Sequence, residues 1–188
     1  MTYYAKIGSP IGELLIVSNE TSLTRVCMDK QKYGAEIRAD WIEYPDLEPI
    51  SLASEQLRAY FAGQLKKFDL PLTMVGTPFQ RRVWAELTKI PFGKVISYGE
   101  LARRIDNPNA SRAVGLANGK NPMAIIVPCH RVIGSNGNLT GYGGGLPNKR
   151  YLLEMEQSLE QGGAKTDENF EGDLWTWSKR KEVPSECN

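Results

Sequence analysis

Apolar and polar residues alternate along the first 28 residues, a pattern typical of strands that bury one face. A polar stretch over 30–50 with two prolines follows and is predicted to be irregular. A helix is predicted from Ser51 to Ala62, and Gly63 ends it. Gly76 is the predicted boundary between two subdomains. The first strands, separated by turns, are predicted at 3–7, 12–17 and 23–28.

Helical periodicity replaces this alternation after Gly76. Thr77 is a suitable N-cap for a helix that carries Val83 and Trp84 on its apolar side and stops before Pro91. Two short helices then follow with a short break between them, which predicts a helix-turn-helix. The two helices are predicted over 97–106 and 110–119. The last clear helix is predicted from Pro147 onward.

The helix over 110–119 is rich in small residues, and Arg112 projects among them. Small residues let a backbone approach a partner closely. Such a helix could lie against a DNA groove and place Arg112 in the base stack. The alternative is a helix packed tightly against a neighbouring element, and the segment alone fits both interpretations.

Cys129 lies next to His130, the single histidine of the chain, where Pro128 ends the apolar run that begins at Ile125. This run predicts a buried strand. A thiol is nucleophilic as thiolate, so a reactive cysteine needs help from its surroundings. Neighbouring side chains of an extended chain point to opposite sides, so Cys129 and His130 are not expected to touch unless Pro128 bends the backbone. A bridging water, with a third group holding the imidazole, would connect them. The alternative is a buried structural cysteine beside a surface histidine.

The last clear helix supplies a candidate for that third group. Glu156 lies among apolar positions there, and a carboxylate in such surroundings needs a partner, for which His130 is a candidate. The glycine-rich loop 141–145 offers backbone N–H groups near the thiol. Cys27, in contrast, fits a core position of a strand.

Composition narrows the class of protein. The chain has 188 residues, 41% hydrophobic and 24% charged, which are ordinary globular values. No signal peptide or membrane-spanning run is recognised, so three cysteines predict free thiols in a reducing cytoplasm. One histidine argues against a zinc site. Residues 76–160 hold 11 basic and 6 acidic side chains, a net +5 that fits either a polyanionic partner or an ordinary surface.

Several motifs, taken together and in order, resemble the O6-alkylguanine-DNA alkyltransferases, also called methylated-DNA–protein-cysteine methyltransferases. The resemblance covers roughly residues 1–160 and is strongest over 77–156. It rests on Phe79-Gln80 with Val83-Trp84, Pro91-Phe92-Gly93-Lys94-Val95-Ile96-Ser97-Tyr98, Ser111-Arg112-Ala113-Val114-Gly115, Asn121-Pro122, Ile126-Val127-Pro128-Cys129-His130-Arg131-Val132-Ile133-Gly134 and Gly141-Tyr142-Gly143-Gly144-Gly145.

The resemblance implies an α/β fold class with two domains. Residues 1–75 would form a ribonuclease-H-like α/β domain, and residues 76–160 a winged helix-turn-helix-like domain for DNA binding and alkyl transfer. Residues 161–188 are an extension of unknown role. The implied activity is irreversible, one-shot transfer of an alkyl group from O6 of guanine, and from O4 of thymine, in double-stranded DNA, with the base flipped out of the duplex.

The resemblance also implies roles for individual residues. Cys129 would be the alkyl acceptor, His130 the group that deprotonates it through water, and Glu156 the carboxylate that orients His130. Asn121 would brace the active-site turn, and Tyr98 would crowd the phosphate and donate to the guanine ring. Arg112 would fill the gap left by the flipped base. The remaining implied contacts are Asn107, Ser135 and Ala113 with DNA, and Val132, Tyr142 and Gly143 in the substrate pocket.

Two other classes of function compete with transfer. A non-enzymatic lesion sensor would bind alkylated DNA without reacting, but the intact Cys129 favours transfer. A cysteine hydrolase would need a histidine that faces the thiol directly. The expected protein is a monomer without metal or cofactor, with no membrane contact, and it is cytoplasmic, or nuclear in a eukaryote.

Overall fold

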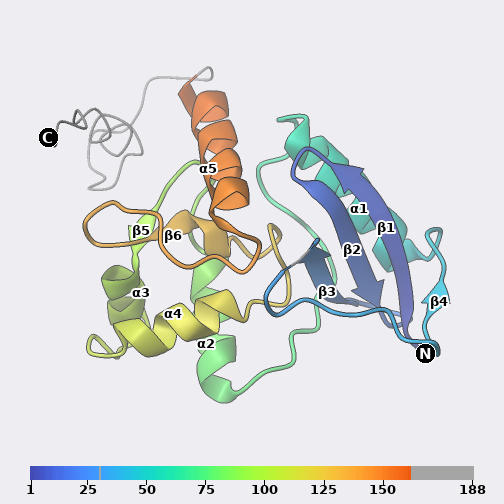
Figure 1. Cartoon of the computed structure of the whole chain (residues 1–188), viewed down its shortest axis with the longest axis horizontal. Helices are drawn as coiled ribbons and strands as arrows, with labels where there is room; N and C mark the ends of the chain where they lie inside the picture. Colours follow the sequence, from blue (N-terminus) through green and yellow to red (C-terminus); the bar gives the residue numbers. More distant parts are fainter. Residues whose placement is uncertain (30, 162–188) are drawn as a thin grey trace, which may run out of the picture.

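The structure is a computed structural model that describes residues 1–29 and 31–161. Its N-terminal half is a four-stranded sheet in the order β3-β2-β1-β4 (Figure 1). The first three strands form an antiparallel meander, and β4 runs parallel to β1. The three predicted strands are therefore confirmed. The bounds are β1 Tyr3–Ser9, β2 Gly12–Ser18, β3 Leu23–Met28 and β4 Ile42–Glu43.

One helix, α1 (Glu48–Phe61), packs against β1 and β2 of this sheet. Its inward side carries Ile50, Ala53 and Leu57, which are fully buried. The helix begins before the predicted Ser51, because Pro49 lies in the first turn, where the missing N–H costs no hydrogen bond. Helix α1 thus turns one apolar stripe to the sheet and carries further side chains toward the second half of the chain.

The second half is mostly helical, with one small parallel sheet (Figure 1). Thr77 and Gln80 form a reciprocal capping box at the start of the first helix. At the start of α3, Ser97 accepts from the N–H of Glu100, whose carboxylate pairs with arginines instead of completing a box. The elements are α2 Pro78–Leu87, β5 Ile96–Ser97, α3 Tyr98–Arg104, α4 Ser111–Gly119, β6 Val132–Ile133 and α5 Leu146–Gln161.

The strand predicted from Ile125 is wrong. The segment is a buried turn in which Val127 N–H donates to the carbonyl of Met123 and Ile125 has φ of +71°. A positive φ is unusual for a β-branched residue. The run is apolar because it is enclosed between the two halves of the protein, and apolar runs of this length do not distinguish strand from buried turn. Cys129–Arg131 then form a 3₁₀ turn, η1.

The free edge of the N-terminal sheet holds this turn in place. Strand β3 pairs on its outer side with Leu72 near one end and with Met123 near the other. Val26 N–H donates to the carbonyl of Pro122 over 2.9 Å, and Ala124 N–H donates to that of Val26 over 2.9 Å. Covering the edge satisfies backbone groups that would otherwise be unpaired. The turn that leads to Cys129 is therefore fixed by the N-terminal half.

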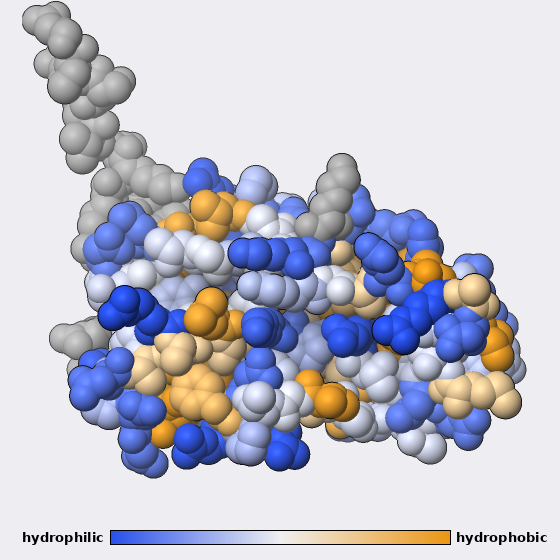
Figure 2. Space-filling view, turned by 60° about the horizontal axis from the view of Figure 1, so that its bottom comes forward, coloured by the Kyte–Doolittle hydropathy of each residue, from blue (hydrophilic) through white to orange (hydrophobic). Residues whose placement is uncertain are grey.

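The surface mixes hydrophilic and hydrophobic side chains (Figure 2). A compact apolar area lies at the lower left of that view, on the side that holds α3 and α4 in Figure 1. Leu116 of α4 is 63% exposed, one turn from Arg112. Within 1–29 and 31–161, no helix has the length and hydropathy needed to span a membrane.

Candidate active site

Cys129 lies at the first position of η1, and 6% of its surface is exposed. The side chain of Asn121 holds the turn beneath it. Asn121 Nδ2 donates to Cys129 Sγ over 3.0 Å, to the carbonyl of Val127 over 2.8 Å and to that of Met123 over 3.2 Å. Its Oδ1 accepts from Met123 N–H over 3.0 Å. Asn118, which we did not single out from the sequence, donates to the carbonyl of Cys129 over 3.3 Å.

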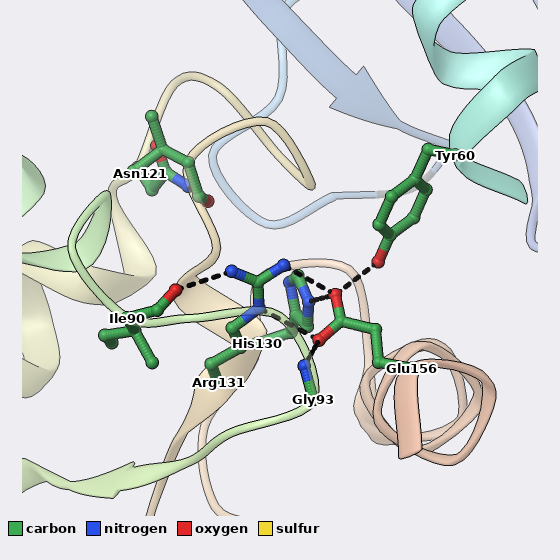
Figure 3. A network of polar contacts seen from close by, with 8 residues as sticks. Tyr60, Ile90, Gly93, Asn121, His130, Arg131 and Glu156 are labelled. Carbon is green, nitrogen blue, oxygen red and sulfur yellow. Dashed lines mark hydrogen bonds and ion pairs between the residues drawn. The ribbon is translucent and has the colours of Figure 1, made fainter. Parts of the chain in front are cut away.

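Figure 3 shows the polar network that surrounds Glu156 and includes His130 and Arg131. His130 is fully buried, and its Nε2 lies 2.9 Å from Glu156 Oε1. Because the carboxylate accepts, the imidazole proton belongs on Nε2. Nδ1 is buried without a hydrogen-bond partner among the described residues. The ring therefore has a free acceptor nitrogen on the side away from Glu156.

Glu156 receives more donors than the sequence predicts. Arg131 grips both carboxylate oxygens, with Nε 2.9 Å from Oε2 and Nη2 2.8 Å from Oε1. Gly93 N–H donates to Oε2 over 3.0 Å, and the hydroxyl of Tyr60 donates to Oε1 over 2.6 Å. The buried Arg131 charge is thereby paired, and its Nη1 donates to the carbonyl of Ile90 over 2.7 Å. Tyr60 comes from α1 and gave no local sequence signal.

The resting thiol and imidazole are both neutral. Burial raises the pKa of the Cys129 thiol, although the hydrogen bond from Asn121 and the charge of Lys149 oppose that shift. Burial also lowers the pKa of His130, against the pull of Glu156. Glu156 itself stays ionised, because His130 and Arg131 lower its pKa despite burial. The arrangement favours proton transfer from sulfur to imidazole during attack over a preformed ion pair.

Lys149 is a fully buried lysine of α5 that the sequence interpretation missed. Its Nζ donates to the carbonyl of Val132 over 2.6 Å and to that of Thr140 over 3.0 Å. Burial lowers its pKa to about 8. The signal was present in the sequence, since Lys149 lies two helical turns before Glu156 and therefore on the same face of one helix. The two hydrogen bonds of Lys149 connect β6, the strand that follows Cys129, to the loop that contains Thr140.

A cavity of about 630 Å³ opens between α4 and the glycine-rich loop. Tyr98 and Tyr142 both line this cavity, and burial raises the pKa of both hydroxyls, with a further upward contribution from nearby Cys129 when its thiol ionises. The Tyr98 hydroxyl donates to the carbonyl of Thr140 over 3.1 Å. Cys129 itself does not line the cavity. Those of the sequence-predicted site residues that line it are Tyr98, Arg112, Ser135, Tyr142 and Gly143.

The other predicted contact residues are not among those that line this cavity. Asn107 is exposed in the turn between α3 and α4, and Ala113 is exposed on α4. Val132 is buried, with its N–H bonded to the Cys129 carbonyl and its own carbonyl to Lys149. The roles of these residues stay predictions. The extension 161–188 falls, apart from its first residue, outside the described residues, as does Cys187.

The described residues contain no group of three or more histidine, cysteine, aspartate or glutamate side chains placed to hold a metal ion. Cys27 is a free, buried cysteine of β3, as expected for a core position.

Comparisons with known proteins agree with this geometry. The ribonuclease-like domain of 6-O-methylguanine DNA methyltransferase matches residues 2–74, and the DNA-binding domain matches 78–158. Methylated-DNA–protein-cysteine methyltransferases of Methanosarcina acetivorans and Mycobacterium bovis are 53% and 54% identical, covering 83% and 84% of this chain and 99% and 94% of theirs. The crystal structure of Mycobacterium tuberculosis OGT in complex with DNA matches with a TM-score of 0.78 at 53% identity, covering 84% of this chain and 94% of that one. The predicted fold class is confirmed.

Proposed function

Since the chain belongs to the 6-O-methylguanine DNA methyltransferase family, we propose that it repairs alkylated DNA by direct reversal, with Cys129 as the acceptor. An alkyl group passes irreversibly from O6 of guanine in double-stranded DNA to the protein, and each molecule acts once. The observation that carries this assignment is a cysteine held by Asn121 beside a His130–Glu156 pair, next to a cavity that opens at α4.

The chemistry balances with the groups present. Cys129 Sγ forms a bond to the alkyl carbon while the bond from that carbon to O6 breaks, and the electron pair stays on guanine. The thiol proton moves toward His130, whose Nδ1 is free and whose Nε2 proton is anchored by Glu156. The departing guanine anion can accept a hydrogen bond from the Tyr98 hydroxyl, which lines the cavity, and the proton released by the thiol balances it when it passes on from His130 to the guanine ring.

Binding of DNA is assigned to the α4 side. Arg112 and Leu116 lie one turn apart at the mouth of the cavity, and Gly115 and Gly119 leave the backbone open between them. A helix of this kind fits a minor groove, where insertion of a side chain into the stack compensates for a flipped base. Sequence readout is weak in that groove, which suits a protein that must recognise damage in any sequence.

The organisation of the whole chain is proposed on the same basis. Residues 1–75 form the ribonuclease-like domain, residues 76–160 the DNA-binding and alkyl-transfer domain, and residues 161–188 an extension. The protein is proposed to act as a monomer in the cytoplasm, or in the nucleus of a eukaryote, and to need no cofactor.

Intact mass tests the transfer directly. After the protein is mixed with a duplex containing one O6-methylguanine, we expect a gain of one CH₂ unit, located on the Cys129 peptide, with the lesion restored to guanine. The same duplex with unmodified guanine and the Cys129→Ser variant are the controls, and both should give no gain. Tight binding of the lesion duplex without any mass gain would instead identify a lesion sensor.

Arg112→Ala tests the assignment of α4. Because Arg112 acts in this proposal only when a base has left the stack, its loss should slow transfer from duplex DNA about tenfold or more, equivalent to about 1.4 kcal/mol. Reaction with free O6-benzylguanine should change little. Both rates come from single-turnover measurements on the same preparation. A similar loss with both substrates would show that Arg112 supports the fold of the site and not the extrahelical base.

A further inference from the structure

Tyr60 reaches the site from the opposite half of the molecule. It belongs to α1, is fully buried, and donates its hydroxyl to Glu156 Oε1 over 2.6 Å (Figure 3). The same oxygen lies 2.9 Å from His130 Nε2. One carboxylate oxygen is thus shared between an N-terminal tyrosine and the imidazole next to the thiol.

We propose that Tyr60 is a positioning residue for alkyl transfer, whose hydroxyl holds Glu156 and sets the basicity of His130 from the N-terminal half of the chain. This inference rests on the proposed function, because the proposed function assigns His130 as the proton acceptor. The geometry is specific, because a phenylalanine at this position would fill the same space between Phe61, Phe68 and Phe92 without donating. The aromatic ring serves packing, and the hydroxyl serves Glu156.

The direction in which Tyr60 shifts the pKa of His130 follows from competition between hydrogen-bond donors for Glu156 Oε1. Each donor to a carboxylate oxygen takes up part of its negative charge, and the charge that remains stabilises the imidazolium form of His130. Removing the Tyr60 hydroxyl leaves Oε1 to His130 and Arg131. His130 should then hold a proton more strongly, and its pKa should rise by about half a unit, which is about threefold in proton affinity.

The other charged groups near His130 act on its pKa in the same way in the wild type and in a Tyr60→Phe variant. Lys149 of α5 and Arg131 of η1 lower its pKa, and Glu156 raises it. The ionisable groups in the electrostatic surroundings of the ring and its carboxylate are Cys129, Arg131, Tyr142, Lys149, Glu156 and Tyr60. Only the last is changed in the variant, so a shift measured at His130 reports the Tyr60 hydroxyl.

The single histidine of the chain makes the test direct. Untagged protein labelled in histidine gives one imidazole signal by NMR, whose titration is compared between the wild type, Tyr60→Phe and the control Tyr151→Phe. Tyr151 lies on α5, the helix of Glu156, and its hydroxyl makes no hydrogen bond within the described part of the chain. We expect an upward shift of the His130 midpoint in Tyr60→Phe alone. The ¹⁵N shift of Nε2 reports the same hydrogen bond at pH values where the ring stays neutral.

Single-turnover transfer supplies the second readout. Because transfer requires neutral His130, the acid limb of the rate profile should move to higher pH by the same half unit in Tyr60→Phe. Coincident His130 signals in the wild type and Tyr60→Phe would overturn the inference, even if that variant were less stable. A wild type that transfers nothing would refute the proposed function, while the NMR comparison would still decide whether Tyr60 controls His130.

A folding defect in Tyr60→Phe would not block the test. Site-specific replacement of Tyr60 by 3-fluorotyrosine retains the ring and strengthens the hydroxyl as a donor. The His130 midpoint should then move down, opposite to Tyr60→Phe. An unchanged midpoint in this variant would overturn the inference as well.

Discussion

Glu156→Gln should abolish rapid alkyl transfer and destabilise the protein by about 3–5 kcal/mol, the cost typical of breaking a buried ion pair. Five donor contacts converge on the two oxygens of Glu156. An amide replaces one of those oxygens by a donor and leaves the buried Arg131 without its countercharge. It also leaves no anion to hold the Nε2 proton of His130. Urea unfolding and single-turnover transfer measure the two losses.

Two controls separate the structural from the chemical loss. Glu154→Gln makes the same change on the exposed side of α5 and should shift the unfolding free energy by less than about 0.5 kcal/mol. The double variant Glu156→Leu with Arg131→Met removes both buried charges and should recover part of the stability without recovering transfer. If Glu156→Gln unfolded at wild-type urea concentrations, the ion pair would not stabilise the fold as assigned.

Asn121→Asp should be nearly as damaging, although it preserves shape. The Nδ2 group of Asn121 donates to two carbonyls and to Cys129 Sγ, and an aspartate puts an oxygen in its place. Each buried acceptor left unpaired costs about 1–3 kcal/mol, so a loss of about 3 kcal/mol or more is expected. The thiol loses its donor and gains a nearby carboxyl, so its pKa should rise further, and transfer should slow at least about tenfold.

Alkylation of Cys129 by iodoacetamide across pH, read on its own peptide, measures the thiol separately from DNA binding. The matched control is Asn19→Asp. The Oδ1 of Asn19 only accepts, from Thr21 N–H and Ser22 N–H among others, so an aspartate can replace it. A Cys129 profile unchanged in Asn121→Asp would mean that Asn121 braces the turn without acting on sulfur.

Local patterns predicted the elements well where local chemistry decides them. The alternation over 3–28 predicted the strand meander, and Thr77 as an N-cap predicted the start of α2. The strand at Ile125 failed because burial, and not strand periodicity, explains its apolar run. An apolar sequence indicates that a segment is buried. The backbone conformation of such a segment is then determined by the segments packed around it.

Some residues of the candidate site could be recognised from the sequence, and others could not. Cys129, His130 and Glu156 were recognisable because a nucleophile, a lone histidine and a carboxylate on an apolar face are each unusual. Tyr60 was not recognisable, since a tyrosine on an amphipathic helix is ordinary until the fold brings it to Glu156 across 96 positions of sequence. Long-range hydrogen bonds between buried groups leave no periodic signal, so this part of the site required the structure.

The crowding of donors around Glu156 has a meaning for a protein that acts once. Enzymes that turn over must reopen to release product, and tight, fully satisfied sites tend to slow that step. In the proposed reaction the alkyl group stays on Cys129, so no product leaves the thiol side and only the restored guanine returns to its duplex. The residues behind the sulfur therefore do not need to move during the reaction. Glu156 can be held rigidly by hydrogen bonds from three separate segments, which contribute Arg131, Gly93 and Tyr60.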